Sequence, residues 1–449
     1  MDDEEVKDLA RKIAKSTSSE RIILITDLYK TSTERKDFLA PVRVGIELRN
    51  GWMIDLAEQV LLFATYRDEG KDSALYELAL CKFLKGQLNQ AKQLINEIKK
   101  IKKLRLDQAI REAIIEARLG NFSSAKTLMS KVISDNSHFI NSGLAWLQMF
   151  DFLADYPYEK AKSLLAEVEK KYRKLEALEI EEQVIQALKE KRPYMLLRLG
   201  DGEGANTRIS WVDEATYPIL YNENRKEFHS TWFGRTDFIN SVEFSDFLNC
   251  FDDALLNADC ISGYENNLLN HEYSIGSRRG IPSVVNLIRK ADQIYPIVKG
   301  KCCITHSVIH YALLFSDCLE RILKDRKFLG IVTCHTNLPE KLQEKYHIGE
   351  VESYFIPKEM GRSSILGDKA KRGTHFPDAY QSLSEKLKSI RPGELYLVAG
   401  GILGKVYCNI IKQAGGVVID IGTVADIWMG KVTRDVDSSI INRIPEYTL

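Results

Sequence analysis

The stretch "MLLRLGDGEGA", residues 195–205, places three glycines and two carboxylates directly after an apolar run. The apolar residues predict a short buried strand, and the glycines predict a turn at its carboxyl end. A turn alone explains Asp-Gly, which is a common turn dipeptide. Asp201 and Glu203 also suit another purpose, because two carboxylates on one face of an extended chain can bind a hard divalent cation.

The residues around these carboxylates are compatible with a phosphate ligand. Gly200, Gly202 and Gly204 keep the backbone thin, so that a bulky ligand can approach it. Arg198 offers a forked donor for a phosphate group. A divalent cation at this place would stabilise a diphosphate as a leaving group. The rest of the chain has to decide between this interpretation and a simple turn.

The C-terminal half alternates apolar runs with helical patterns. The runs predict strands, and the amphipathic stretches between them predict helices. Expected strands are 193–200, 327–335, 351–357, 394–400 and 416–422, and expected helices are 338–346, 377–390 and 404–415. This alternation predicts βαβ units and a parallel sheet. In such sheets ligands bind at the carboxyl ends of the strands, where the glycine-rich segment 200–204 is expected to lie.

A second glycine-rich segment, "LVAGGILGKV" (397–406), is not a P-loop. A P-loop has four residues between its first glycine and the Gly-Lys pair, followed by Ser or Thr. Here three residues separate Gly400 from Gly404, and Val406 follows Lys405. A glycine turn before a helix can still present free N–H groups to a phosphate. The alternative is a tight turn that needs glycine only for close packing.

The N-terminal half contains a repeat. "AKQL" at Ala91 and "AKTL" at Ala125 are 34 residues apart, and so are Gly86 and Gly120. This period resembles the tetratricopeptide repeat, in which paired helices approach through small residues and a glycine ends the first helix. A third copy, "AKSL" at Ala161, is degenerate in its spacing. A generic helical bundle is the alternative.

These patterns predict an α plus α/β chain in three parts. Residues 1–40 form a helical N-terminal segment, 41–184 form the TPR-like helical repeat domain, and 185–449 form the α/β domain. Helical repeats bind proteins through a concave face, so a protein partner is expected there. The repeat domain could instead serve only for dimerisation or for packing on its neighbour.

Composition limits the choice of function. Lys plus Arg equals Asp plus Glu, at 63 each, which argues against a nucleic-acid partner. The acidic start "MDDEEVKDLA" lacks a signal peptide's apolar core, and no apolar run reaches membrane-spanning length. The eight cysteines contain no C-x-x-C pair. We therefore expect reduced thiols, a cytoplasmic location and no membrane span.

Three segments, taken together in this order, resemble the GT-D glycosyltransferase family. They are "RLGDGE" (198–203), "AGGILGKVYCNIIKQAGGVVIDIGTVADIW" (399–428) and "GKVTR" (430–434). The resemblance covers roughly 190–435. It implies a Rossmann-like α/β fold and a D-x-E pair that serves a divalent cation, Mn²⁺ or Mg²⁺, and a nucleotide-sugar donor. The matching residues are Asp201 and Glu203.

The closing block of that family carries over to further positions of this chain. A contact with the donor is implied for Arg198 and Gly200 in the first motif. In the closing block the matching residues are Gly401, Gly404, Lys405, Asp420, Gly422 and Asp426. Helix capping and hydrogen bonding at the sheet edge are the alternative roles for the two aspartates. The segment 205–234 does not match the family pattern, so the acceptor stays open.

The expected activity is metal-dependent transfer of a sugar from a nucleotide-sugar, most simply a UDP-sugar, to a glycan or protein. If the reaction inverts the anomeric centre, a base must take the acceptor proton, and His375, Asp378 and Asp426 are candidates. A basic loop, 359–380, either closes over the diphosphate or is an ordinary surface loop. His306 and His310 are interpreted as ordinary helix residues, because no H-E-x-x-H is present.

Two other classes of function stay open. The chain could be a repeat-based scaffold whose α/β domain binds a nucleotide without turnover, although the intact Asp201 and Glu203 speak against a decayed site. A nucleotide-dependent hydrolase or kinase is weakened by the failed P-loop spacing.

Overall fold

The computed structural model describes residues 1–449 apart from 209–210, 369 and 435–437, and leaves the side chains of 201, 211–213, 438–440 and 442 undescribed. The chain forms two compact units. Unit 1 contains Met1–Asp155 and the short segment Tyr273–Ser277, and unit 2 contains Tyr156–Glu272 and Arg278–Leu449. No helix in the described residues is both long enough and apolar enough to cross a membrane.

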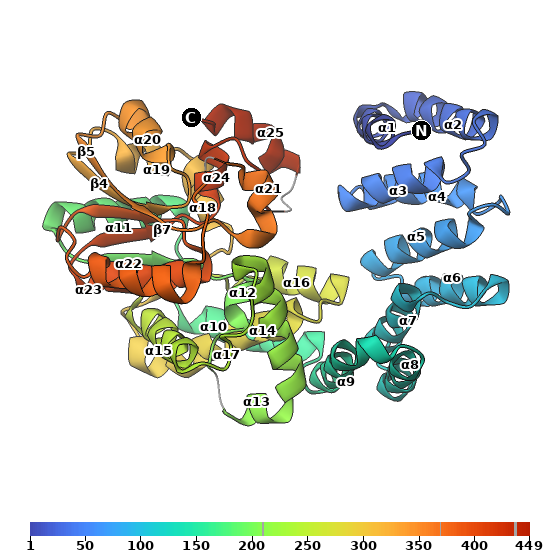
Figure 1. Cartoon of the computed structure of the whole chain (residues 1–449), viewed down its shortest axis with the longest axis horizontal. Coiled ribbons are helices and arrows are strands. Elements are labelled where there is room, and N and C mark those ends of the chain that lie inside the picture. Colours follow the sequence, from blue (N-terminus) through green and yellow to red (C-terminus); the bar gives the residue numbers. More distant parts are fainter. Residues whose placement is uncertain (209–210, 369, 435–437) are drawn as a thin grey trace. The chain divides into compact units, whose positions relative to one another are not determined.

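Unit 1 is built of helices (Figure 1). Its elements are α1 (Asp3–Lys15), α2 (Ser18–Glu34), α3 (Ala40–Asn50), α4 (Ile54–Ala64), α5 (Lys71–Leu84), α6 (Leu88–Ile101), α7 (Leu106–Arg118), α8 (Phe122–Asp135), the 3₁₀ turn η1 (Ser137–Phe139) and α9 (Ile140–Asp155). Consecutive helices pack in pairs, α3 on α4, α5 on α6 and α7 on α8. The predicted helical character of this part is confirmed.

The 34-residue period corresponds to two successive helix pairs. α6 and α8 begin at Leu88 and Phe122, one period apart. The glycines between the paired helices have left-handed backbones, with φ of 73° at Gly86 and 82° at Gly120. Ala91 and Ala125, at equivalent positions of α6 and α8, are fully buried. The repeat is therefore one of structure as well as sequence: glycine permits the turn and alanine permits close helix packing.

Unit 2 combines a sheet with helices. Its elements are α10 (Tyr158–Lys171), α11 (Ala177–Glu190), β1 (Tyr194–Leu197), α12 (Asp201–Gly204), α13 (Trp211–Thr216), α14 (Pro218–Phe233), α15 (Val242–Asn257), β2 (Cys260–Ser262), α16 (Asn266–Ile275, whose last residues belong to unit 1), α17 (Gly280–Val298), β3 (Cys303–Thr305), α18 (Ile309–Phe315), α19 (Cys318–Leu323), β4 (Phe328–Thr333), α20 (Leu338–Tyr346), β5 (Glu350–Phe355), η2 (Met360–Arg362), α21 (Ser363–Leu366), η3 (His375–Ala379), α22 (Tyr380–Leu387), β6 (Leu395–Val398), α23 (Gly401–Gln413), β7 (Val417–Asp420), α24 (Val424–Trp428) and α25 (Ser438–Tyr447).

The seven strands form one sheet in the order β3-β2-β1-β7-β6-β4-β5. Every pair of neighbours is parallel. From β1 the chain moves outward through β2 to β3 and then crosses to β4 on the other side. The connection from β6 to β7 runs in the same direction as those from β1 to β2 and from β2 to β3, whereas the connection from β4 to β5 runs the opposite way. The direction of winding therefore changes between β6 and β4. In open parallel sheets ligands bind in the crevice outside the carboxyl ends of the strands.

Helices cover both faces of the sheet. Figure 1 shows the strands between α22 and α23 on one side and α19, α20 and α24 on the other. Alternate strand residues point to opposite faces. Leu196, Ile331, Leu397 and Ile419 join the core that also contains residues of α11, α19 and α20. Residues one step along each strand face the side of α23, and Asp420 lies on that side.

The predicted combination of a helical part and an α/β part is confirmed, and so are all five predicted strands. β2 and β3, of three residues each, were not predicted. The predicted boundary at 184/185 falls inside α11, whereas the structural division falls before α10. α10 packs on α17, and α11 packs on α18 and α19. α10 and the first part of α11 were assigned to the repeats from sequence, but both helices belong to the α/β unit.

Candidate functional site

Three segments that are distant in sequence meet at the carboxyl edge of the sheet. β1 leads into Arg198–Glu203, β6 leads into the start of α23, and β7 leads into the segment that carries Asp420 and Asp426. β1, β7 and β6 are direct neighbours in the sheet. The predicted site residues of these segments therefore lie at the carboxyl ends of three adjacent strands.

The carboxylate motif is helical, not extended. Asp201–Gly204 forms the short helix α12. Residues two apart on a helix do not face the same way. The prediction of an extended chain at residues 201–203 is therefore wrong. The side chain of Asp201 lies outside the described part of the structure.

The glycines of α12 serve packing. A Cβ atom at Gly202 would lie 2.4 Å from the Trp232 ring, and one at Gly204 would lie 2.1 Å from the carbonyl oxygen of Ser283. These distances are far below van der Waals contact. The expectation that these two glycines make room for a ligand is replaced by a simpler reason, namely that α14 and α17 approach α12 too closely for any side chain.

Glu203 is engaged by two neighbours. Its Oε2 accepts a hydrogen bond from the N–H of Gly200 at 3.0 Å, and its Oε1 lies 3.3 Å from Nζ of Lys405. The side chain keeps 13% of its surface exposed. Burial favours the neutral acid, but the charges of Lys405 and Arg198 outweigh burial and hold the pKa of Glu203 below its ordinary value. Glu203 is therefore a carboxylate at neutral pH.

Asp420 accepts three hydrogen bonds from buried surroundings. It accepts from Nζ of Lys405 at 2.5 Å, from the N–H of Arg198 at 3.2 Å and from the N–H of Gly422 at 3.1 Å. Its side chain is only 2% exposed. These bonds tie the end of β7 to the end of β1. The alternative role in hydrogen bonding at the sheet edge therefore accounts for Asp420.

Lys405 is a buried bridge between two carboxylates. Its side chain is 3% exposed and contacts both Asp420 and Glu203. Burial disfavours the ammonium form, but the two carboxylates outweigh it and raise the pKa of Lys405. A lysine held in this way orients Glu203 and does not extend toward a ligand.

Arg198 lies against the backbone of β7's exit loop. A Cβ atom at Gly422 would fall 1.6 Å from a guanidinium nitrogen of Arg198. Gly422 has a φ of 48°. Glycine at this position thus satisfies a left-handed backbone and leaves room for the guanidinium. Nε of Arg198 is buried and has no hydrogen-bond partner among the described residues.

The turn before α23 is tight. A Cβ atom at Gly400 would lie 2.8 Å from Cα of Gly404, and one at Gly404 would lie 3.2 Å from Val398. Gly401 has a φ of 57°, and the space where its Cβ would stand is open. Close packing explains Gly400 and Gly404. Gly401 leaves an open position beyond the end of β6.

Asp426 and His335 form a contact that the sequence did not suggest. His335 follows β4, and its Nε2 lies 2.7 Å from Oδ1 of Asp426. Thr433 donates its hydroxyl to Oδ2 of the same carboxylate. Asp426 thus has both oxygens oriented by other segments. The signal that could have found His335 is its place at the carboxyl end of a predicted strand.

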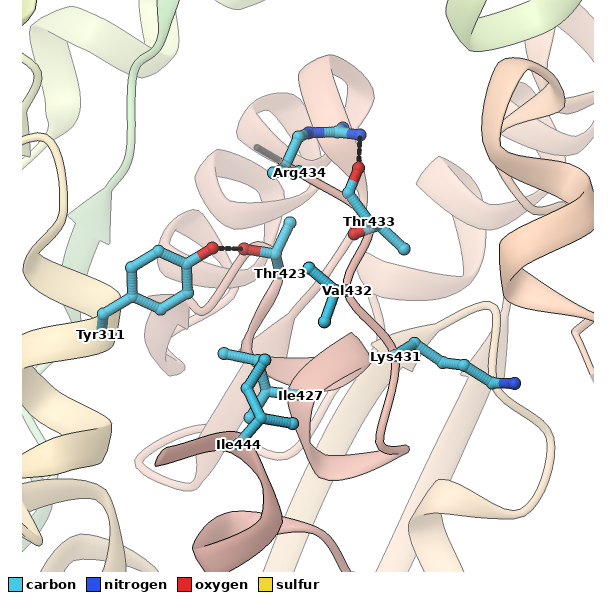
Figure 2. A pocket seen from close by; sticks show the side chains of 8 residues that line it. All are labelled: Tyr311, Thr423, Ile427, Lys431, Val432, Thr433, Arg434 and Ile444. Carbon is cyan, nitrogen blue, oxygen red and sulfur yellow. Dashed lines mark hydrogen bonds between the residues drawn. The ribbon is translucent and has the colours of Figure 1, made fainter. Parts of the chain in front are cut away.

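A small pocket lies beside this loop. Figure 2 shows its lining by Tyr311, Thr423, Ile427, Lys431, Val432, Thr433, Arg434 and Ile444. The Tyr311 hydroxyl lies 2.7 Å from Oγ1 of Thr423, and Nε2 of His310 lies 3.3 Å from the same atom. Burial, and then the charges of Arg198 and Lys405, hold the pKa of His310 well below its ordinary value. His310 is therefore a neutral neighbour of the site.

Arg434 connects this pocket to the other charges. It pairs with Glu359 through both carboxylate oxygens, at 2.6 Å and 3.3 Å. Burial opposes its charge, but Glu359, and more weakly Asp426 and Glu203, raise the pKa of Arg434. The structure thereby brings Arg434, within the "GKVTR" segment, into the electrostatic surroundings of both Glu203 and Asp426.

His375 and Asp378 lie in a different environment. His375 is buried, and its Nε2 lies 2.9 Å from the hydroxyl of Tyr407. Burial, and then the charge of Lys371, lower the pKa of His375 to about 3. Asp378 is exposed. The contacts of His375 are those of a packed core residue.

Hydrogen bonds to backbone carbonyls fix the first part of the basic loop and the residue before it. The N–H of Lys371 donates to the carbonyl of Cys334 at 2.9 Å. Lys358 directs its ammonium to the carbonyls of Ser363 and Gly367, at 3.0 Å and 2.8 Å. Short helices η2 and α21 occupy part of the segment that seemed to lack any period. Lys369 lies outside the described residues.

Comparisons with known proteins add nothing to this picture. A scan against protein-family models, a search of curated proteins and a search of solved structures each found no match to this chain.

Proposed function

We propose that this chain is a metal-dependent glycosyltransferase that moves a sugar from a nucleotide-sugar, a UDP-sugar in the simplest case, to a glycan or protein acceptor. One observation carries the proposal. The segments that resemble the GT-D family, 198–203, 399–428 and 430–434, converge at the carboxyl edge of one parallel sheet, beyond the adjacent strands β1, β7 and β6. That is the ligand-binding place of Rossmann-like sheets.

The described residues fit a cation that binds together with the diphosphate. Mg²⁺ is usually held by one or two carboxylates plus substrate phosphates, so a cage of protein ligands is not needed. Among the residues that the structure describes, no group of three or more His, Cys, Asp or Glu side chains could hold a metal. Glu203 supplies one ionised carboxylate, and each of its oxygens has a second lone pair. The resemblance assigns the second carboxylate to Asp201.

In this proposal, each residue of the chain has a defined task. The bound cation offsets charge on the leaving diphosphate. Arg198, whose Nε lacks a partner in the described residues, donates to a phosphate. Lys405 and Asp420 hold Glu203 and the Arg198 backbone in position. Gly401 leaves the open position into which the donor fits.

The helix pairs of unit 1 fit a partner-binding role within the same proposal. Their 34-residue period and glycine turns are those of a TPR-like repeat, and such repeats bind proteins. We assign to this unit the recognition of the acceptor or of a protein that presents it, and we place the activity in the cytoplasm.

The test is release of UDP from a panel of UDP-sugars, with and without Mn²⁺ or Mg²⁺. Glu203→Gln runs beside the parent, with Glu385→Gln as a matched control, because Glu385 is a surface residue with 72% of its side chain exposed. We expect metal-dependent release with one sugar, lowered at least about 100-fold in Glu203→Gln and unchanged in the control.

UDP binding, measured by calorimetry in the same samples, separates the alternatives. Metal-dependent binding without release from any donor would favour the scaffold that binds a nucleotide without turnover. Folded protein that neither binds UDP nor releases it would contradict the proposal.

A further inference from the structure

The contact between His335 and Asp426 spans the end of a strand. His335 follows β4 and Asp426 lies on α24, which follows β7. β6 lies between these two strands in the sheet and ends in the glycine turn at Gly400 and Gly401. The two side chains meet at 2.7 Å across this position. The pair therefore links, at the carboxyl edge, the segments that follow the two strands on either side of β6.

The chemistry of the pair fixes the direction of the hydrogen bond. An ionised carboxylate only accepts, so Nε2 of His335 carries the proton and donates it to Oδ1 of Asp426. Thr433 donates to Oδ2. Each oxygen retains a free lone pair, and 15% of the Asp426 side chain is exposed, against 3% for His335. Asp426 is thus a carboxylate with access to solvent, and its orientation is fixed by a hydrogen bond from a buried imidazole.

Asp426 interacts electrostatically with groups that also interact with Glu203 or Arg198. The negative charges of Asp426 and Glu203 both raise the pKa of Arg434. Tyr311, in the pocket of Figure 2, interacts electrostatically with Arg198, Arg434 and Asp426. Asp426 therefore shares one electrostatic environment with the proposed metal carboxylate and the proposed phosphate donor.

The two other base candidates do not have these properties. His375 is buried against Tyr407 and stays neutral above a pH of about 3, but it has no contact with the carboxylates at the end of β7 in the hydrogen bonds of the described residues. Asp378 is exposed and interacts with the charge of Arg235.

We propose that Asp426 is the catalytic base for the acceptor and that His335 is its positioning residue; this rests on the proposed glycosyltransferase function. Asp426 takes the proton of the acceptor hydroxyl. The hydroxyl oxygen forms a bond to the anomeric carbon while the bond from that carbon to the diphosphate oxygen breaks. The electron pair leaves with the nucleoside diphosphate, and the proton passes from Asp426 to solvent. This single displacement inverts the anomeric centre.

The first experiment uses the full chain, the donor found in the UDP-release panel, and water or a glycan as acceptor. Asp426→Asn keeps the shape and removes the base. We expect kcat to fall about 10²- to 10⁴-fold with the Kd for UDP unchanged. Asp368→Asn, at a side chain that is 89% exposed, is the matched control and should match the parent. NMR of the early product should show inversion at the anomeric carbon.

The second experiment addresses His335. His335→Gln keeps an N–H donor at the same reach, whereas His335→Ala removes it. We expect His335→Ala to lower kcat at least about 10-fold without changing the KM for the donor, and His335→Gln to recover most of that loss. His347→Asn, at an exposed histidine, is the control.

Two outcomes would overturn the assignment while leaving the transferase intact. They are retention at the anomeric carbon and full activity of Asp426→Asn. His335→Ala and His335→Gln could instead lose activity equally, with a lower Tm and weaker UDP binding in both variants. That result would show that the contact between His335 and Asp426 only stabilises the fold. Failure of the transferase itself is recognised differently, by a parent protein that does not bind UDP.

Discussion

Asp420 is the last residue of β7 and Asp426 lies six residues further on, yet their surroundings differ in kind. Asp420 is 2% exposed and accepts three hydrogen bonds from Lys405 and two backbone N–H groups. Asp426 is 15% exposed and is oriented by His335 and Thr433 with lone pairs to spare. The first arrangement stabilises the junction of β1 and β7, while the second leaves a carboxylate ready for a ligand. Position at the carboxyl edge is therefore not enough to identify a catalytic group.

The largest expected effect comes from the buried cluster of Lys405, Asp420 and Glu203. Lys405→Met leaves the carboxylates of Asp420 and Glu203 buried together without their shared cation. Removing one partner of a buried ion pair costs about 3–5 kcal/mol of unfolding free energy. Urea unfolding measures it. Lys388→Met, at a surface pair with Glu385, is the control and should leave the midpoint unchanged. Equal stability of parent and Lys405→Met would remove the distinction between the two aspartates.

The second prediction concerns the stability that three buried histidines lose as the pH falls. Burial lowers the pKa of His229 and of His375 to about 3, from an ordinary 6.5, and lowers the pKa of His310 as well. As pH falls below 6.5, protons bind these side chains in the unfolded chain first, so stability falls. Each histidine contributes a slope of about 1.4 kcal/mol per pH unit between roughly pH 6 and its folded pKa.

Urea unfolding at pH 7, 6 and 5 measures this slope. His347→Asn, at an exposed histidine, should leave it unchanged. Stability that stays constant from pH 7 to pH 5 would show that these three imidazoles bind protons as readily in the folded protein as in the unfolded chain, contrary to the environments described above.

The third prediction concerns α12. Gly204→Ala places a methyl group 2.1 Å from the backbone oxygen of Ser283, and a backbone atom cannot move aside cheaply. We expect a loss of about 1–3 kcal/mol, because overpacking forces α12 and α17 apart. Thermal unfolding measures it. If Gly204→Ala were fully stable but unable to bind UDP, the glycine would serve ligand approach after all.

The smallest expected effect concerns Thr433. Thr433→Val keeps the shape of the side chain and removes its hydrogen bond to Asp426. We expect a stability loss of about 1 kcal/mol, the typical net value of one hydrogen bond. Because His335 still orients Asp426, kcat should fall less than about 10-fold. A greater loss than in His335→Ala would assign the positioning role to Thr433 instead.

The parts of the fold that depend on local pattern were predictable. The 34-residue spacing located the turns at Gly86 and Gly120, and the apolar runs located five strands. β2 and β3 were missed because runs of three residues are too short to show a period. The turn predicted for 201–204 proved to be helical, because α12 is held by its packing on α17 rather than by dipeptide preference.

The candidate site was predictable in location but not in detail. Glycines and carboxylates after strands marked the carboxyl edge, and the sheet places them there. The number of hydrogen bonds and ion pairs that each carboxylate makes depends on contacts between residues far apart in sequence, such as Lys405 with Glu203. These contacts are visible only in the fold. His335 was missed for the same reason, since its partner Asp426 lies 91 residues away.

A crystal structure of the protein with UDP and Mn²⁺ would test the central claim most directly. Anomalous scattering locates the manganese independently of the model of the nucleotide. The account predicts a manganese ion beside Glu203, with the diphosphate over the ends of β1 and β7 and within reach of Arg198. A nucleotide bound elsewhere on the protein, or manganese bound away from Glu203, would contradict it.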